Sequence, residues 1–350
     1  MTKPSEFEAL PESDQAARLA QLVLAAGAHW DGGFADVELV KYRENAVFSA
    51  RRPDGARVAV RVHRHGYHSD AALHSELAWM RALGETGDVA VPPVLAASDG
   101  RLVVEVTHDE VPLPRQVSVL GWLNGVPAGT SEDGVALDDE AAARLYHHAG
   151  ALAARLHSHA TSWAPPEGFT RHAWDADGLI GETPLWGRFW EYDGLDDDQR
   201  RLLLEARSRA ALDLAALGAG PHNYGLIHAD LVPENLLDHD GRLELIDFDD
   251  AGYGWFLFEL ATALYFNLGR SCYEDVRQSL LTGYRSARPL SAEDEASLPL
   301  FLFLRGTTYL GWVQSRPGTE TSRNLGPMLR TMACAAAESY LSARATGKVG

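Results

Sequence analysis

The stretch IHADLVPENLL at residues 227–237, followed by LIDFDD at 245–250, decides how this sequence is interpreted. In both segments a short apolar run, typical of a strand, leads into a polar loop. The first loop has the spacing H-x-D-x-x-x-x-N, which ends at Asn235, and Asp247 comes 12 residues later. Because loops at strand ends often present side chains to ligands, the two segments predict a functional site.

This spacing suits phosphoryl transfer from a nucleotide. Asp230 would accept or orient the proton of an acceptor hydroxyl, while Asn235 and Asp247 would hold Mg²⁺ through oxygen atoms. The alternative is that Asp230 and Asn235 only cap turns, as these residue types commonly do. A chain of this composition would contain only about 0.02 such triplets by chance, which favours the functional interpretation.

The composition indicates a globular protein that favours cationic partners. The chain has 350 residues, of which 46% are hydrophobic, and a formal net charge of −18. This length suffices for two domains. So acidic a chain repels nucleic acid and anionic lipid, and no basic patch in the sequence offsets this repulsion. We therefore expect neither nucleic acid nor a membrane as a partner.

The sequence also predicts a cytoplasmic protein. Its two cysteines, Cys272 and Cys334, are too few for a disulfide framework and lie in stretches typical of buried helices. The N-terminal residues lack the basic region and apolar core of a signal peptide, and no run approaches the ~20 apolar residues of a membrane span.

The first part of the chain predicts a small lobe rich in β-structure. Apolar residues at helical spacing in 12–28 predict a helical extension over 1–35. From 36 to 120, alternation with a period of two predicts a nucleotide-binding lobe with a five-stranded antiparallel sheet, interrupted by one helix at 69–83. Pro-Asp-Gly at 53–55 predicts a tight turn within this sheet.

The rest of the chain predicts a larger, mainly helical lobe. The turn-rich segment 121–125 is expected to be a hinge, and 126–350 a catalytic and acceptor-binding lobe. Helical periodicity is strongest over 138–159 and 196–217. The predicted fold is therefore α+β with two lobes, and the acidic loops of 225–250 belong to the second lobe.

The two quoted segments, together with AGYG at 251–254, resemble the aminoglycoside phosphotransferase family. This family is a branch of the protein-kinase-like fold that also contains choline and homoserine kinases and a bacterial stress-response kinase. The resemblance covers about residues 36–310 and implies a bilobal protein-kinase-like fold. Its motifs are specific to the superfamily and do not identify a substrate.

The resemblance also implies roles for individual residues. Asp230 would be the catalytic base, Asn235 and Asp247 would bind Mg²⁺, and His228 would support the loop. Asp249 stands where protein kinases have the glycine of D-F-G. It would either contact the metal, directly or through another group, or cap the turn.

The nucleotide phosphates require a cation, which kinases place on the third strand and pair with a glutamate on the inserted helix. Arg61 occupies the position of the usual lysine, and Glu76 is its expected partner. A guanidinium group is always charged and can bind phosphate through two hydrogen bonds. The alternative is that Arg61 is a surface strand residue. The glycine-poor loop 42–46, with Asn45, would cover the phosphates through its backbone amides.

The nucleotide base is expected at the junction of the lobes, with Val60 and Ile246 among the apolar walls of its site. Its backbone partners would be Leu120, Gly121, Trp122 and Leu123. The sequence leaves open whether the phosphoryl donor is ATP or GTP.

The predicted activity is nucleotide-dependent transfer of a phosphoryl group to a hydroxyl of a small molecule, because the A-P-E segment and long activation loop of protein kinases are missing from the sequence. The acidic chain favours an amine-bearing acceptor, such as an aminoglycoside-like antibiotic or an amino alcohol. Two alternatives stay open: a protein Ser/Thr kinase of the stress-response type, and a nucleotide-binding pseudokinase that acts as a regulatory module. The acceptor and the oligomeric state are likewise left open.

Overall fold

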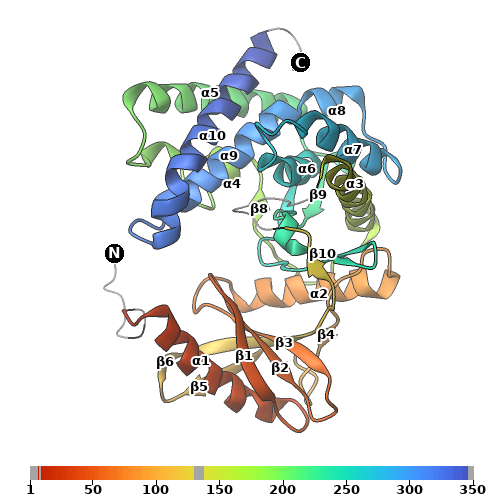
Figure 1. Cartoon of the computed structure of the whole chain (residues 1–350), viewed down its shortest axis with the longest axis vertical. Coiled ribbons are helices and arrows are strands. Elements are labelled where there is room, and N and C mark those ends of the chain that lie inside the picture. Colours follow the sequence, from red (N-terminus) through yellow and green to blue (C-terminus); the bar gives the residue numbers. More distant parts are fainter. Residues whose placement is uncertain (1–6, 8, 130–137, 346–350) are drawn as a thin grey trace. The chain divides into compact units, whose positions relative to one another are not determined.

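The computed structural model describes residues 7, 9–129 and 138–345. The chain divides into two compact units (Figure 1). Unit 1 comprises Met1–Asn124 and Ala164–Thr170, and unit 2 comprises Gly125–Trp163 and Arg171–Gly350. The chain passes from unit 1 to unit 2 between Asn124 and Gly125, inside the segment 121–125. The hinge function of that segment stays a prediction.

Unit 1 contains an antiparallel sheet of six strands in the order β1-β2-β3-β6-β4, with β5 paired to β6. The strands are β1 (Ala35–Tyr42), β2 (Ala46–Arg51), β3 (Arg57–Val62), β4 (Val94–Leu95), β5 (Val104–His108) and β6 (Val111–Gly121). The predicted number of five strands is wrong by one, because β4 has only two residues and shows no periodicity.

The predicted turn joins β2 to β3. Gly55 has a φ of +82°, which glycine adopts without a steric penalty, and the Ala56 N–H donates to Asp54 Oδ1 at 3.0 Å. Helix α2 (Asp70–Thr86) is the predicted insertion. Its first turn is capped by Ser69, whose Oγ accepts a hydrogen bond from the Ala72 N–H at 3.2 Å.

Helix α1 (Glu12–Ala26), followed by the 3₁₀ turn η1 (Gly27–His29), packs on one face of this sheet (Figure 1). Val60 and Phe48 belong to the core that α1 covers. Paired residues on neighbouring strands project to the same face, and Val60 pairs with Phe48 whereas Arg61 pairs with Val47. Val60 therefore lies on the face opposite Arg61, and the expectation that it lines the nucleotide site is wrong.

Unit 2 is mainly helical. Its helices are α3 (Asp139–Ser162), α4 (Ala176–Ile180), α5 (Asp197–Leu217), α6 (Phe256–Tyr265), α7 (Tyr273–Arg285), α8 (Ala292–Ala296), α9 (Leu298–Gln314) and α10 (Glu320–Ala345), with the 3₁₀ turns η2 (Phe189–Glu191) and η3 (Pro233–Asn235). The strongest predicted helices correspond to α3 and α5. None of the helices in the described ranges combines the length with the hydrophobicity that a bilayer-spanning segment needs.

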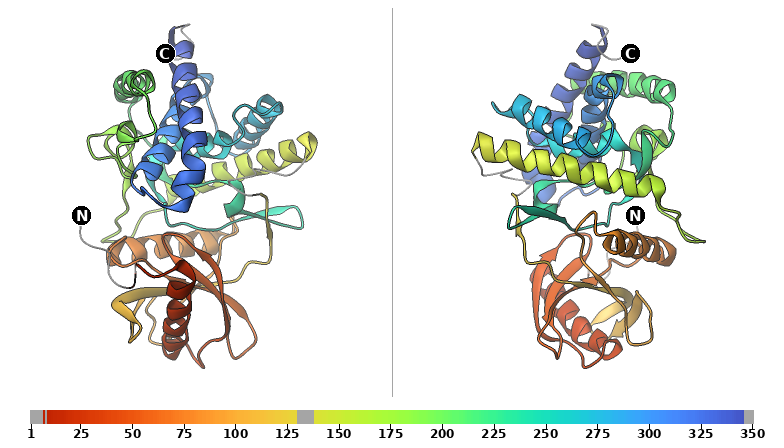
Figure 2. Two further views of the ribbon diagram at one scale, coloured as in Figure 1. Left: turned by 60° about the vertical axis from the view of Figure 1, so that its left-hand side comes forward. Right: turned by 90° about the vertical axis from the view of Figure 1, so that its right-hand side faces the viewer.

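Helices α3 and α7 pack closely along each other (Figure 2). Glycines at the crossing allow this approach: a Cβ on Gly150 would lie 2.0 Å from the Leu280 backbone oxygen, and one on Gly283 would lie 1.9 Å from the His147 backbone oxygen. Any larger residue at either position would push the two helices apart.

Two small sheets in unit 2 position the loops of the quoted motifs. One has the order β11-β10-β7, and the other β8-β12-β9. Their strands are β7 (Val126–Pro127), β8 (Ala173–Trp174), β9 (Tyr224–Ile227), β10 (Leu236–His239), β11 (Arg242–Leu245) and β12 (Gly252–Trp255). The loop 228–235 runs from β9 to β10, and the loop 246–251 runs from β11 to β12. Each loop thus starts in one sheet and ends in the other.

Candidate active site

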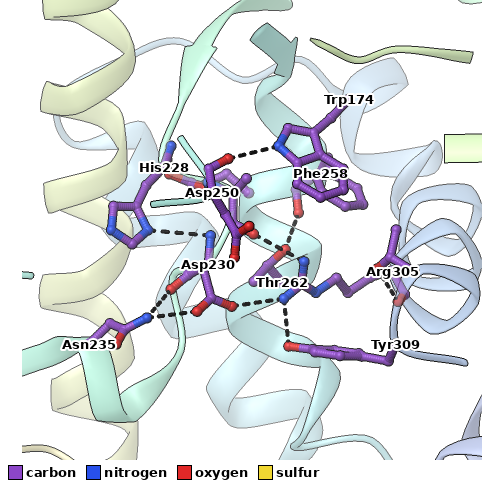
Figure 3. A network of polar contacts seen from close by, with 12 residues as sticks. Trp174, His228, Asp230, Asn235, Asp250, Phe258, Thr262, Arg305 and Tyr309 are labelled. Atoms are coloured by element: carbon purple, nitrogen blue, oxygen red, sulfur yellow. Dashed lines mark hydrogen bonds and ion pairs between the residues drawn. The ribbon is translucent and has the colours of Figure 1, made fainter. Parts of the chain in front are cut away.

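His228 links the two motif loops of unit 2. Its side chain is fully buried, and its Nε2 donates to the Ile246 backbone oxygen at 2.9 Å. The Asp230 N–H donates to His228 Nδ1 at 3.3 Å (Figure 3). Between them Ala229 has a φ of +65°, which turns the chain sharply and which non-glycine residues rarely adopt. This histidine therefore fixes where the Asp230 loop lies relative to the second loop.

Both carboxylate oxygens of Asp230 are held in place. Oδ1 accepts a hydrogen bond from Arg305 Nη2 at 2.9 Å, and Oδ2 accepts one from Asn235 Nδ2 at 2.8 Å (Figure 3). The side chain nevertheless keeps 21% of its surface exposed. The result is a carboxylate in a fixed orientation that a ligand in solvent can reach.

Asn235 and Asp247 offer oxygen ligands from the two loops. The Asn235 amide nitrogen donates to the Asp230 backbone oxygen at 2.9 Å as well as to its carboxylate, which leaves the amide oxygen Oδ1 as the ligand atom. The Asn235 backbone oxygen accepts from the Ile246 N–H at 3.0 Å, so this residue is bonded to the immediate neighbour of the exposed Asp247. Amide and carboxylate oxygens suit a hard divalent cation.

The described residues contain no group of three His, Cys, Asp or Glu side chains arranged to hold a metal ion. A site of two protein oxygen ligands is common for Mg²⁺, which usually keeps several waters and completes its shell with substrate phosphates. The residues present therefore fit Mg²⁺ held together with a nucleotide.

Asp249 and Asp250 lie in the second loop. Arg171 donates to the backbone oxygen of the buried Asp249 and to that of Ala251, the latter at 2.5 Å. Burial raises the pKa of the Asp250 carboxyl well above its ordinary value, and the nearby carboxylates of Asp230, Asp249 and Asp247 add to this effect. The loop thus brings several carboxyl groups close together, and the raised pKa favours the neutral form of Asp250.

Arg305 in α9 is a site residue that the sequence analysis missed. Its side chain is fully buried. Besides contacting Asp230, it donates from Nη1 to the Ala229 backbone oxygen at 3.0 Å and from Nη2 to the Tyr309 hydroxyl at 2.7 Å. A usable signal exists in the sequence, because Arg305 is the single charged residue in the apolar helix LPLFLFLRGTTYLGWVQ. Such a charge requires a buried partner.

Glu259 in α6 is a second residue that the sequence analysis missed. It could have been found in the same way, because it is the single charged residue in the apolar helix FLFELATALY. Its two carboxylate oxygens accept the N–H groups of His228 at 3.0 Å and Ala229 at 2.6 Å. Burial raises the pKa of Glu259 to about 7, although these two backbone donors act in the opposite direction. Burial lowers the pKa of the nearby His157 well below its ordinary value, which favours the neutral imidazole.

In unit 1, Arg61 on β3 donates from Nη1 to Glu76 Oε1 on α2. The two residues keep only 5% and 1% of their surfaces exposed. The alternative that Arg61 is a surface residue is therefore wrong. Its expected ion pair with Glu76 is present, and it fixes β3 relative to α2.

Asn45 lies in the turn between β1 and β2. Its backbone oxygen accepts from the Arg43 N–H at 3.2 Å, and its side-chain oxygen accepts from the Arg64 N–H at 3.1 Å. These bonds shape the turn that was expected to cover the phosphates.

The four residues expected to contact the base lie at the end of β6 and just beyond it. Leu120 pairs with Ala59 on β3. The N–H of Gly121 donates to Pro93 and that of Trp122 donates to Arg57. A base bound along this segment therefore cannot use these two N–H groups as donors, whereas Leu123 lies beyond the strand.

Comparisons with known proteins agree with this geometry. A model of the phosphotransferase enzyme family matches residues 38–290. Amicoumacin kinase of Bacillus subtilis (strain 168) is 25% identical over 246 residues, which cover 70% of this chain and 67% of that protein. A protein of Deinococcus radiodurans is 30% identical over 279 residues, which cover 76% of this chain and 74% of that protein.

Solved structures give the same result. The structure of the microcompartment-associated aminopropanol kinase has a TM-score of 0.80 and 34% identity, and the match covers 92% of this chain and 97% of that one. Amicoumacin kinase hAmiN in complex with AMP-PNP, Ca²⁺ and Ami has a TM-score of 0.72, with 93% and 96% covered. At 21% identity, this second match shows the fold alone.

These findings confirm the predicted family, fold class and enzyme class. The family model covers more than half of the chain, including both motif loops and the Arg61–Glu76 pair. Several of the matched proteins are kinases named for small molecules. The chain therefore belongs to the phosphotransferase enzyme family and is a small-molecule kinase with the protein-kinase-like fold.

Proposed function

We propose that this enzyme transfers the terminal phosphoryl group of ATP or GTP to a hydroxyl of a small amine-bearing molecule, and that Asp230 is its catalytic base. The observation that carries the proposal is the Asp230 carboxylate, which is reachable from solvent and held by Arg305 and Asn235 at 2.9 and 2.8 Å. The carboxylate takes the proton of the acceptor hydroxyl as its oxygen attacks the terminal phosphorus, and the nucleoside diphosphate leaves. A prepositioned base lowers the entropic part of the barrier.

Asn235 through Oδ1 and Asp247 through its carboxylate would hold Mg²⁺, with Asp249 as a third candidate. When bound, the ion supplies positive charge that offsets the phosphates. In unit 1, Arg61 would bind phosphate while Glu76 orients its guanidinium group. The Asn45 turn and the segment from Leu120 to Leu123 would contact the phosphates and the base.

The acceptor proposed is an amino alcohol, with an aminoglycoside-like antibiotic as the second candidate. The carboxylates of Asp230, Asp247 and Asp249 lie close enough to Asp250 to raise the pKa of its carboxyl, and the whole chain carries −18. A protonated amine close to these groups would relieve their mutual repulsion. The aminopropanol kinase, which is 34% identical to this chain, is named for an acceptor of the same class. A cytoplasmic location agrees with two buried cysteines that form no disulfide.

The test is a panel of acceptors assayed with ATP and with GTP in the presence of Mg²⁺. Amino alcohols, hydroxy amino acids, aminoglycosides, neutral polyols and a generic protein substrate are compared by nucleotide consumption and by product mass. We expect turnover with a hydroxylated amine and a product heavier by one phosphoryl group. Turnover confined to neutral or anionic acceptors would overturn the amine class, and labelling of the protein substrate alone would favour a protein kinase.

A further inference from the structure

Arg305 connects two parts of the site by donating hydrogen bonds to three groups. Its guanidinium donates to the Asp230 carboxylate at 2.9 Å, to the Ala229 backbone oxygen at 3.0 Å and to the Tyr309 hydroxyl at 2.7 Å (Figure 3). Asp230 and Ala229 lie in the loop after β9, whereas Tyr309 lies one turn further along α9. One side chain thus joins this helix to the proposed catalytic base.

The surroundings of Arg305 show how strongly it depends on Asp230. The guanidinium carbon lies 4.1, 5.2 and 5.6 Å from the ring centres of Tyr309, Trp186 and Phe258. A cation with no exposed surface among aromatic rings is costly unless an anion and hydrogen bonds compensate it. The Asp230 carboxylate is the anion in direct contact with it. The pair therefore constrains both partners.

The hydrogen bonds to both oxygens of Asp230 restrict the directions from which a substrate can approach. Asn235 holds Oδ2 and Arg305 holds Oδ1, on opposite sides of the carboxylate (Figure 3). An acceptor hydroxyl must use a remaining lone pair, whose direction is set by the plane of the carboxylate. The bond from Arg305 to Ala229 also supports the left-handed backbone that precedes Asp230.

We propose that Arg305 is a positioning residue for phosphoryl transfer. It sets the plane of the Asp230 carboxylate, and through Tyr309 it ties this orientation to the next turn of α9. The inference rests on the proposed role of Asp230 as the base. Arg305 acts through Asp230 and does not itself touch the reacting atoms.

The experiment compares Arg305→Lys, Tyr309→Phe and Asp230→Asn with the wild type. Lysine keeps the buried positive charge but lacks the planar fork that reaches three acceptors. We expect Arg305→Lys to lower kcat about 100-fold, the loss typical of a displaced catalytic group, while KM for ATP changes less than about threefold. Tyr309→Phe removes one hydrogen bond to a charged group, so we expect a smaller loss in kcat of about tenfold.

The matched control is Arg207→Lys. Arg207 also donates to a carboxylate, Glu182 at 2.7 Å, and to a backbone oxygen, and it lies 4.1 Å from the Trp190 ring centre. Its hydrogen bonds, ion pair and ring contact among the described residues do not involve the motif loops, so its replacement should leave kcat unchanged. Thermal unfolding of all variants shows whether a loss of activity is only a loss of fold.

A second readout separates positioning from a purely structural role. An acceptor whose hydroxyl is made more acidic by neighbouring fluorine atoms depends less on the base. We expect such an acceptor to recover part of the kcat lost in Arg305→Lys and none of the activity lost through unfolding. Wild-type kcat in both Arg305→Lys and Tyr309→Phe, with Asp230→Asn inactive, would overturn the inference alone. Equal turnover by the wild type and Asp230→Asn would overturn the proposed function as well.

Discussion

Four charged side chains with almost no exposed surface organise the residues proposed to carry out the chemistry. Arg305 and Glu259 hold the Asp230 loop in unit 2, and Arg61 is paired with Glu76 in unit 1. Buried charges of this kind contribute little net stability, yet removing one partner leaves the other uncompensated. Variants at these positions must therefore be designed so that stability and activity can be separated.

Replacement of Asp230 by asparagine should abolish catalysis. We expect kcat to fall at least about 100-fold, because the amide cannot accept the proton of the hydroxyl. The buried Arg305 loses its anion, so the free energy of unfolding should fall by up to about 3–5 kcal/mol. Steady-state kinetics and denaturant unfolding measure the two effects.

The control is Asp240→Asn, at a side chain that is 99% exposed. Its φ of +53° is one that asparagine tolerates, so neither activity nor stability should change. An Asp230→Asn enzyme with kcat within about threefold of the wild type would contradict the assignment of the base.

The Arg61–Glu76 pair can be tested by replacing both residues with apolar ones. Arg61→Met alone should cost about 3–5 kcal/mol of stability, because Glu76 stays buried without its cation. The double variant Arg61→Met/Glu76→Leu should recover most of this loss. Its affinity for ATP should nevertheless fall at least about tenfold, since the charged contact to phosphate is missing.

Thermal unfolding and calorimetric titration with Mg·ATP distinguish these outcomes. A double variant that is stable and binds ATP as tightly as the wild type would show that Arg61 has no role in phosphate binding.

At the level of elements, the site is built by loops between short strands. Side chains of α6 and α9 hydrogen-bond to these loops and stabilise them. The sequence predicted the loops well, because Asp230, Asn235 and Asp247 stand at a diagnostic spacing within 20 residues of one another. It did not predict Glu259 or Arg305, which lie 30 and 75 residues from their partners. Their contacts depend on how the helices pack against the loop. In the sequence, the one indication of their role is that each is the single charged residue of an apolar helix.

The errors in the β-rich part have other causes. Alternation located β1, β2, β3, β5 and β6 but not β4, which has two residues. Alternation also shows that Val60 and Arg61 occupy opposite faces of the sheet. The expectation that both residues line the nucleotide site therefore overlooked the strand pattern itself.

Glu259 in α6 should make the stability of the folded protein depend on pH. Its carboxyl has a pKa of about 7 in the folded protein against an ordinary value of 4.5, because it is buried. At a pH between these two pKa values, the folded protein binds a proton that the unfolded chain has lost. The free energy of unfolding therefore falls as the pH rises through 7. The contribution is fully present below about pH 4.5 and is lost above about pH 7.

We expect the wild type to lose about 1 kcal/mol more stability than Glu259→Gln between pH 6 and pH 8. The glutamine cannot titrate, so its stability should lack this component, although it is lower overall because one backbone N–H loses its acceptor. Denaturant unfolding at both pH values measures the difference. Identical pH dependence in the two proteins would contradict the assigned pKa shift.

For the whole molecule, the net charge of −18 sets the long-range interaction with substrates. A cationic acceptor is attracted at low ionic strength, and salt screens this attraction over about 10 Å at 0.1 M. At saturating ATP, we expect KM for a protonated amine to rise several-fold between about 20 mM and about 500 mM salt. KM for a neutral analogue serves as the control and should stay constant. Equal salt dependence of KM for the amine and for its neutral analogue would show that net charge has no role in acceptor recognition.

The most direct test of the central claim is the mass of the product formed from ATP and an amino alcohol by the wild type and by Asp230→Asn. The account predicts an amino alcohol heavier by one phosphoryl group, released by the wild type and missing with the variant. It also predicts that the phosphoryl group is attached to the hydroxyl oxygen, which ³¹P NMR identifies. Product formed equally by both proteins, or a phosphoryl group on the nitrogen, would contradict it.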